Sequence, residues 1–371
     1  MLQPRQTNSY QLTLLSSAAV FCWMVVYAFF AWLHFDLMAS DAAGYWKEAN
    51  SLISSGYDLS VIYTVFHHDH VPGFPILIAL GRTILPSLNP LFIMQAIIMI
   101  AWILSIVCVH LIFRTLNLSH AWLGTLFFII YPLVGVTYVV YPIADNLAML
   151  AVTAALLGLL KDNKVLLAVS LATGPLIHKA TWPMLGLIVL LGLWRRRDRV
   201  WMLLPLGVPL LVYWFYGLHY THDWLWILGR YPKFMSRRTA LPLFDGLFGP
   251  ILARGSLKDW IKSLVVVSVY GTAVWLLIRG TWRREPVMLS IMIPILLWGG
   301  LYIAIMIWPL VRFGNLLVIP LWLHLHEKVF TKDGTRTDRL PHRVVWIGLI
   351  SMSVLSQFAW AYYMTTFLYE H

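Results

Sequence analysis

Long apolar runs separated by short polar breaks occupy nearly the whole chain. The runs lie near 12–33, 88–113, 120–140, 143–160, 164–178, 181–194, 200–219, 263–279, 287–308, 310–326 and 343–366. Most approach the roughly 20 residues that an α-helix needs to cross a bilayer. The pattern therefore predicts one all-α, polytopic integral membrane domain over residues 1–371, with about 11 transmembrane helices. The pair at 164–194 is short enough to be tilted or re-entrant.

Composition agrees with a membrane domain and argues against other classes of protein. Of the 371 residues, 60% are hydrophobic and 12% are charged, which lies outside the range of soluble domains. The net charge of +11 would suit a nucleic-acid partner, but no nucleic-acid motif accompanies it, and basic cytoplasmic loops explain it. Cys22 and Cys108 lie inside apolar runs, so the sequence predicts neither a disulfide framework nor a Cys-based metal site.

The distribution of basic residues predicts the orientation of the chain. With a cytoplasmic N-terminus, the inner loops hold more than half of the 27 Lys and Arg residues, including the Arg195–Arg199 cluster. This bias is typical of the cytoplasmic side, and we interpret that cluster as a topology signal only. The run at 12–33 is then an uncleaved signal-anchor, and the loops at 34–87 and 220–262 are extracytoplasmic. The compartment outside is that of a plasma membrane, or the lumen of the endoplasmic reticulum in a eukaryote.

The first outer loop contains a predicted helix on the membrane surface. After Ser40, apolar and polar side chains fall on opposite faces of a helix that Gly56 ends. The apolar face contains Tyr45, Ala49, Leu52 and Ile53, and the polar face contains Lys47, Glu48, Ser51 and Ser54. The pattern predicts an interfacial helix on the outer leaflet. The Pro-rich turn at 71–75 should start a second, short apolar helix near 76–86.

Asp41 is the candidate catalytic residue of this loop. With Ser40 as N-cap, Asp41 is the first residue of the predicted helix, where the helix dipole favours a carboxylate. Such a group can take a proton from a hydroxyl or hold that hydroxyl in line for attack. Alternatively, Asp41 only favours the start of the helix. Asp36 could share the acceptor or simply mark the interface.

The loop also contains the dense cluster His67-His68-Asp69-His70. These side chains could donate hydrogen bonds to a phosphate or to a sugar hydroxyl, which is our preferred interpretation. A divalent metal held by His67, Asp69 and His70 is the alternative, but adjacent residues seldom converge on one ion. Surface solvation alone would also account for His67 and His68.

Cations in the second outer loop and in a late span are candidates for binding a lipid phosphate. Basic residues in 220–262 alternate with aromatic residues, and the candidates there are Arg230, Lys233, Arg237 and Arg238. General attraction to anionic headgroups is the alternative. Arg312 lies in an apolar run and needs an anionic partner, which a leaving phosphate, Asp41 or Asp145 could supply, unless it snorkels to the interface. The same alternatives, a functional anionic partner, a structural ion pair or snorkelling to the interface, apply to Lys179, which follows His178.

Four short motifs, in this order, resemble those of GT-C glycosyltransferases, which are membrane enzymes that use polyprenyl-phosphate sugars. The first outer loop has Asp41-Ala-Ala-Gly-Tyr45, and it closes with His70-Val-Pro-Gly-Phe-Pro75. Tyr141-Pro-Ile-Ala-Asp145 resembles the Pro-x-x-acid motif of this family, and Arg312-Phe313 resembles an Arg-aromatic motif near the outer end of a late span. The chain departs from several members in having a lone Asp41 rather than an acidic pair.

The resemblance implies a GT-C-like fold and an inverting sugar transfer on the extracytoplasmic face. The donor would be a sugar on undecaprenyl or dolichyl phosphate, and the acceptor a lipid, a glycan or a protein. Asp41 would be the catalytic base. The residues assigned to the donor phosphate are Arg312, Arg237, Arg238, Arg230, Lys233 and His70. The residues assigned to the acceptor or to support are Asp36, Tyr45, His67, Asp69, Asp145 and Lys179.

Two other functions remain open from the sequence. A lipid or lipid-linked-glycan transporter would use the Arg-rich and aromatic loops as a headgroup path. An outer-face ligase or acyltransferase would depend on His and Arg rather than on Asp41. The partners we expect are membrane lipids, a polyprenyl-phosphate-linked sugar and a lipid, glycan or protein acceptor, with no nucleic acid. No bound cofactor is expected, and the need for a divalent metal is left open.

Overall fold

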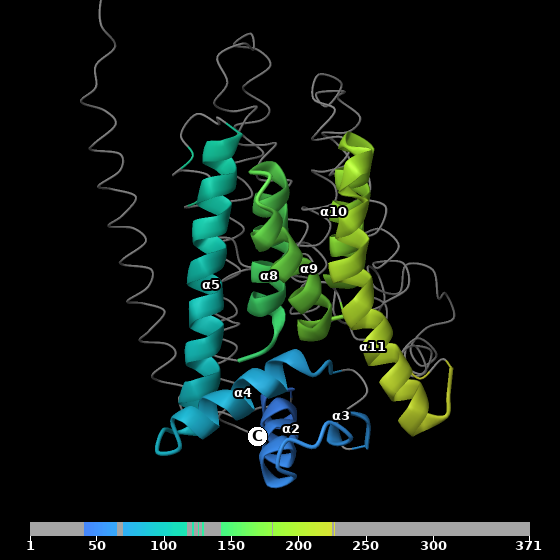
Figure 1. Ribbon diagram of the computed structural model, residues 1–371. Coiled ribbons are helices and arrows are strands. Elements are labelled where there is room, and N and C mark those ends of the chain that lie inside the picture. Colours follow the sequence, from blue (N-terminus) through green and yellow to red (C-terminus); the bar gives the residue numbers. More distant parts are fainter. Residues whose placement is uncertain are drawn as a thin grey trace, which may run out of the picture.

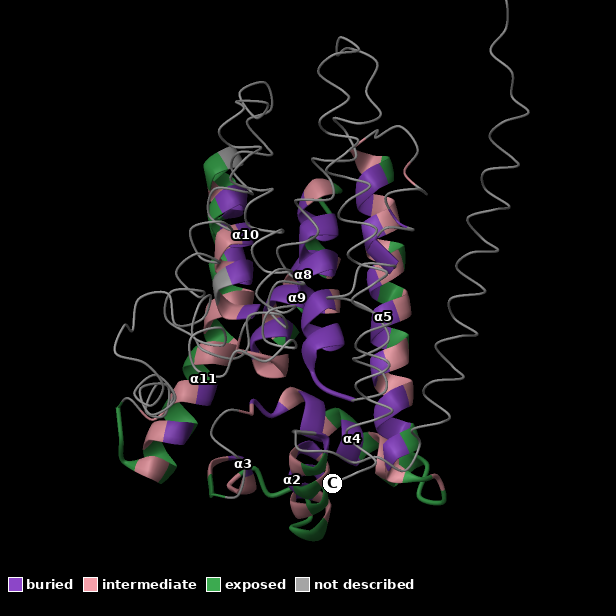
Figure 2. Cartoon of the chain, turned by 180° about the vertical axis from the view of Figure 1, so that it is seen from behind, coloured by how far each residue is buried: buried purple, intermediate pink, exposed green. Residues whose placement is uncertain are grey.

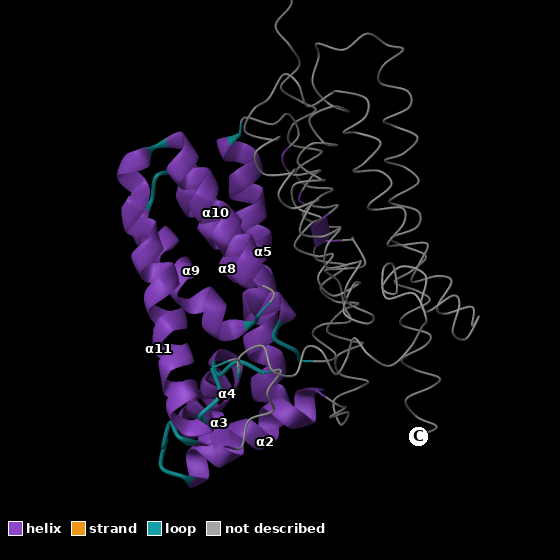
Figure 3. Ribbon diagram, turned by 90° about the vertical axis from the view of Figure 1, so that its right-hand side faces the viewer, coloured by secondary structure: helices purple, strands orange, loops and turns teal. Residues whose placement is uncertain are grey.

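The computed structural model describes residues 41–64, 70–116, 121, 125, 128, 129, 142–179, 181–224 and 226. Within these residues it contains helices and loops and no β-strand (Figure 3). The elements are α2 (Asp41–Ser54), α3 (Val61–Thr64), α4 (Gly73–Ile84), α5 (Pro90–Thr115), α8 (Asp145–Leu160), α9 (Lys164–Ile177), α10 (Thr181–Arg195), η1 (Arg197–Met202) and α11 (Leu203–Thr221). The described part of the chain is therefore all-helical, as the sequence predicts.

The longer helices form a bundle, and the first three elements cover one of its ends. α5, α8, α9, α10 and α11 run along a common direction, while α2, α3 and α4 lie at the lower end in Figure 1. α8 contacts α5, α9 and α10. Of its 16 residues, all except Leu150 and Leu160 are buried (Figure 2). A helix that is apolar on all sides is expected at the centre of a bundle.

Two segments are long and apolar enough to cross a membrane. They are Pro90–Thr115, with 26 residues, and Arg197–Thr221, with 25 residues, which joins η1 to α11. At a rise of about 1.5 Å per residue, the first is about 39 Å long, more than the roughly 30 Å hydrocarbon core of a bilayer. The predicted helices at 143–160, 164–178 and 181–194 correspond to α8, α9 and α10, which are shorter than these two segments. The runs at 12–33 and beyond 263 lie outside the described residues, as does most of 120–140.

Side-chain caps and tight turns set the ends of the helices. The side chain of Asn89 accepts a hydrogen bond of 2.9 Å from the backbone N–H of Leu91 at the start of α5. The side chain of Asn163 does the same for Leu166, at 3.0 Å, at the start of α9. Each cap satisfies a backbone N–H that has no partner inside its own helix. The break between α8 and α9 is consequently only three residues long, from 161 to 163.

The start of α4 packs directly on the end of α9. Gly73 is the first residue of α4, and a Cβ built on it would lie 2.5 Å from the carbonyl oxygen of Leu176. Phe74 and Ile78 of the same helix are completely buried. Glycine allows two backbones to approach more closely than any other residue does. This contact holds α4 across the end of the bundle.

Gly73→Ala should push α4 away from α9. The added methyl group has no space beside the Leu176 carbonyl, so we expect a loss of about 1–3 kcal/mol in the free energy of unfolding, as for other overpacked sites. Denaturant unfolding of the full-length protein in detergent micelles would measure this loss. Gly186→Ala in α10 is the matched control, because its Cβ would meet no described atom within 4 Å. Equal stability of the two variants would contradict the close contact.

Candidate functional site

The end of the bundle covered by α2, α3 and α4 holds an apolar cluster drawn from distant parts of the sequence. α2 contributes Ala42, Tyr45, Ala49 and Leu52, and α4 contributes Phe74, Ile78 and Ala79. They pack against Met94 and Ile98 of α5, Ile143, Ala144 and Leu147 around the start of α8, and Tyr213 of α11. The predicted first outer loop thus contacts ends of helices that the predicted orientation assigns to the same side. We refer to this region as the covered end.

α2 begins at Asp41, which is the residue that the sequence predicts as the start of the interfacial helix. The helix runs for 14 residues to Ser54, and Gly56 follows in a left-handed conformation, with φ of 67°. The predicted stop of this helix is therefore confirmed, whereas the predicted N-cap, Ser40, lies outside the described residues.

His70 lies among polar and aromatic side chains of α2 and α4. Its Nδ1 is 2.8 Å from Oε1 of Glu48, which is 2% exposed. The ring of Tyr45 stacks on the imidazole, with centroids 4.0 Å apart and planes at 21°. Phe74 lies edge-on to Tyr45, and Gly44 leaves room for the edge of the imidazole. Two of the predicted site residues, Tyr45 and His70, are therefore in direct contact.

The prediction that Glu48 lies on the polar face of α2 is wrong. Glu48 is buried beside His70, whereas Lys47 and Ser54 of the predicted polar face are exposed. Glu48 follows Tyr45 by three residues and precedes Leu52 by four, so the helical period itself puts it on the buried side. A buried carboxylate needs a hydrogen-bonded or charged partner, and His70 supplies one.

Helices α8 and α9 bring further polar residues to the covered end. Asp145 and Asn146 are the first two residues of α8, and both are buried. The side-chain Nδ2 of Asn146 has no hydrogen-bond partner in the part of the chain that the structure describes. His178 and Lys179 follow the end of α9 and are half-buried. Hence Asp41, Asp145 and Lys179 all occupy element boundaries at this end.

An aromatic cluster connects the first outer loop to α11. Tyr63 of α3 stacks on Tyr220 with a centroid distance of 5.4 Å and on Tyr216 with one of 6.5 Å. Trp226 contacts both Tyr63 and Tyr213 edge-on. Burial, followed by the neighbouring Tyr216 and Tyr220, raises the pKa of Tyr63 to about 12. Tyr63 therefore stays a neutral phenol at ordinary pH, and the cluster fixes α3 against α11.

Asp58 has a structural role in the turn before α3. Its carboxylate accepts hydrogen bonds from the backbone N–H and the hydroxyl of Ser60, at 2.9 Å and 2.7 Å. These hydrogen bonds, that from the hydroxyl first, lower the pKa of the Asp58 carboxyl. Asp58 is exposed and stabilises this turn, so it offers a control for the acidic residues of the same loop.

Many predicted site residues lie outside the described residues. They are Asp36, His67, Asp69, Arg230, Lys233, Arg237, Arg238 and Arg312. Of the three weak metal candidates only His70 is described, and its Nδ1 faces Glu48. Over the described ranges, no group of three His, Cys, Asp or Glu side chains is arranged to hold a metal ion.

Glu48→Ala should weaken the covered end. The substitution removes the buried partner of His70, and a hydrogen bond to a charged group contributes about 1.5–3 kcal/mol to the free energy of unfolding. We expect a loss in that range, measured by denaturant unfolding of the full-length protein in micelles. Lys47→Ala is the matched control on the exposed side of the same helical turn. A loss no greater than that of the Lys47 variant would show that the Glu48–His70 contact does not stabilise the fold.

Two comparisons with known proteins do not identify a function for the covered end. No protein-family model matches this chain, and a search of the curated proteins finds no significant match. The function must therefore be argued from the covered end itself, from the elements that form it and from the short motifs that they contain.

Proposed function

We propose that this protein is a membrane glycosyltransferase of the GT-C kind that takes its sugar from a polyprenyl phosphate. The observation that carries the proposal is the gathering of α2, His70 and the boundaries of α8 and α9 at one end of the bundle. Sugar transfer at a membrane surface needs a base, cations and access from the bilayer in one place. The covered end supplies candidates for the first two from separate elements.

The lengths of the helices support a membrane location for the covered end. α5 begins at this end and is long enough to cross a bilayer, and α11 returns to the same end. With about 11 spans and a cytoplasmic N-terminus, the covered end faces the extracytoplasmic side. A lipid-linked donor can reach such a site by diffusing within the outer leaflet. The donor therefore need not leave the membrane.

The proposed step is an inverting displacement. The acceptor hydroxyl oxygen attacks the anomeric carbon, and the bond from that carbon to the phosphate oxygen breaks. Its electron pair leaves with the polyprenyl phosphate, while Asp41 accepts the hydroxyl proton. Cations stabilise the charge that develops on the departing phosphate. The reaction is balanced by the donor and the acceptor alone.

The residues of the covered end support separate parts of this step. Lys179 follows α9, and His70 has its orientation fixed by Glu48 and Tyr45. Both are candidates for the donor phosphate or for supporting contacts. The buried Nδ2 of Asn146 is a donor available to a substrate oxygen. The proposal further requires Arg312 and the basic residues of 230–238 to approach the same phosphate.

A second candidate function follows from the Glu48–His70 contact. A carboxylate that is hydrogen-bonded to one nitrogen of an imidazole fixes the orientation of the ring. It also helps the other ring nitrogen to act as a base, as in acyl-transfer enzymes. An outer-face ligase or acyltransferase would use His70 as this base. In that case Asp41 would only favour the start of α2.

Asp41→Asn should abolish sugar transfer. Loss of a general base typically lowers the rate about 10²- to 10⁴-fold, and the amide can still favour the start of the helix. The measurement is transfer of radiolabelled sugar from polyprenyl-phosphate mannose, glucose or aminoarabinose to endogenous acceptors in membranes containing the full-length protein. Asp58→Asn is the matched control, since it removes an exposed carboxylate from the same loop. Near-normal turnover in the Asp41 variant would reject the proposal.

His70→Gln, assayed in parallel, distinguishes the two candidate functions. If His70 binds the donor phosphate, glutamine keeps a hydrogen-bond donor, and transfer should fall by about 10- to 100-fold, as expected for one charge-assisted hydrogen bond. If His70 is instead the base of a ligase or acyltransferase, membranes containing the unmutated protein should transfer no labelled sugar from these donors. Movement of labelled donor between leaflets, without any glycoside product, would instead favour a transporter.

A further inference from the structure

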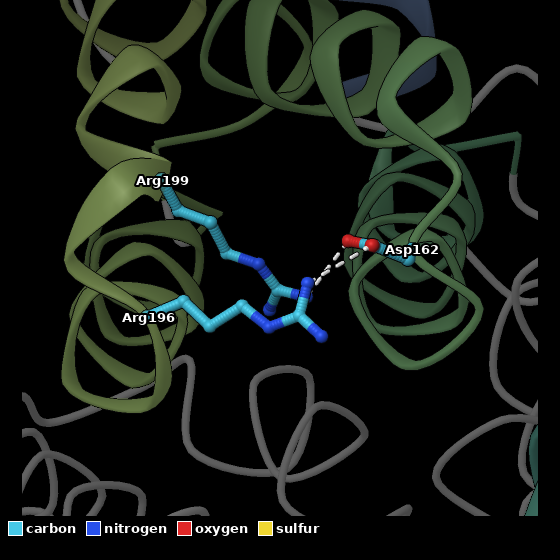
Figure 4. Close-up of polar contacts among 3 residues, drawn as sticks. All are labelled: Asp162, Arg196 and Arg199. Carbon is cyan, nitrogen blue, oxygen red and sulfur yellow. Dashed lines mark hydrogen bonds and ion pairs between the residues drawn. The ribbon is translucent and has the colours of Figure 1, made fainter.

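At the end of the bundle opposite α2–α4, one carboxylate faces two guanidinium groups. The Nη2 of Arg199 donates to Oδ1 of Asp162 at 2.8 Å, and the Nη1 of Arg196 donates to Oδ2 at 3.4 Å (Figure 4). Asp162 lies in the turn between α8 and α9, whereas the two Arg residues lie where α10 gives way to η1. The contact therefore joins two helical connections more than 30 residues apart in sequence.

The backbone holds all three residues at the ends of tight turns. Asp162 has a φ of 57°, and the next residue, Asn163, donates its N–H to the carbonyl of Gly158 at 2.8 Å, which closes the turn. The N–H of Arg199 donates to the carbonyl of Arg196 at 3.2 Å. That short turn brings both guanidinium groups to the same carboxylate, as Figure 4 shows.

The charges of this cluster do not balance. Two guanidinium groups share one carboxylate, and the Nη1 of Arg199 has no hydrogen-bond partner in the part of the chain that the structure describes. Arg199 is only 9% exposed, so its unpaired nitrogen is costly to leave without a partner. Asp162 and Arg196 are about half exposed, so the cluster is open on one side. A second anion on this open side would balance the excess positive charge.

The two connections that form this cluster contain further basic residues. Exposed apolar residues lie next to them in the sequence. Lys161, Lys164 and Arg197 are exposed, and with Arg195 and the two paired Arg residues the two connections contain six cations against Asp162 and Asp198. Exposed apolar side chains belong to the same connections and helix ends. They are Val165, Trp194, Val200 and Leu204, each more than half exposed.

We propose that this cluster binds the phosphate of an anionic lipid headgroup. A phosphate offers several acceptor oxygens in the geometry that a guanidinium fork matches, and basic pockets between membrane helices are suited to such headgroups. The neighbouring exposed Trp194 and Val200 would contact the acyl chains, which a free phosphate does not require. In the predicted orientation, this end is cytoplasmic. The site is separate from the covered end, and its role does not depend on sugar transfer.

The test is lipid binding by the full-length protein in neutral-detergent micelles. Phosphatidylglycerol, phosphatidylcholine and inorganic phosphate are added separately, and bound lipid is measured by native mass spectrometry, with thermal unfolding as a second readout. We expect phosphatidylglycerol to be retained and to raise the unfolding temperature, and phosphatidylcholine to do neither. Arg199→Gln should weaken phosphatidylglycerol binding by about fivefold or more, the effect of one basic residue on an anionic headgroup.

Arg114→Gln is the matched control, because it removes an exposed cation from the same end but outside the cluster. It should leave the affinity unchanged. If Arg199→Gln does not fold, Arg196→Gln decides the question, since its side chain is 59% exposed and little of the fold rests on it. Equal phosphatidylglycerol affinity of the cluster variants and the Arg114 control would overturn the proposal. Protection by inorganic phosphate equal to that by phosphatidylglycerol would overturn the assignment to a lipid.

Discussion

A carboxylate buried at the end of an apolar bundle requires a partner, and the arrangement of the covered end depends on how Glu48 meets this requirement. His70 provides the partner 22 residues away, after the chain has passed through α3. The contact ties α2 to the segment that leads into α4, while Tyr45 closes over the imidazole. Because a helix is stiff, fixing its middle turn also fixes its first residue, Asp41. The candidate base therefore owes its position to a polar pair inside an otherwise apolar cluster.

The helical bundle separates two ends that differ in chemistry. α8 is almost completely buried, and small residues let its neighbours approach closely, as where the backbone of Leu167 crosses Gly158. One end of α8 carries Asp145 and meets α2–α4, and the other leads to Asp162 and the Arg residues around η1. Aromatic and acidic groups thus gather at one end and cations at the other, with a tightly packed apolar layer between them.

Much of the described fold could be predicted from the sequence, because apolar runs and turn residues report local structure directly. The end of α2 before Gly56 and the helix starting near 143 follow from such signals, and the short helix predicted near 76–86 is present but begins three residues earlier, at Gly73, inside the predicted turn. The burial of a single polar residue does not follow from such signals. Glu48 was assigned to the wrong face because a charge outweighed its position in the helical period. The sequence did not predict the pairing of Arg199 with Asp162, because the two residues are 37 positions apart. The Arg195–Arg199 cluster was also fully explained by the orientation of the chain in the membrane.

The shortness of α9 has a consequence for the surrounding lipid. With 14 residues, α9 is only about 21 Å long, well below the roughly 30 Å thickness of a hydrocarbon core. In a bilayer, either the leaflets thin around it or its ends sink beneath the headgroups. In the second case α4, which packs on the last turn of α9, lies at the depth of the acyl chains rather than of water.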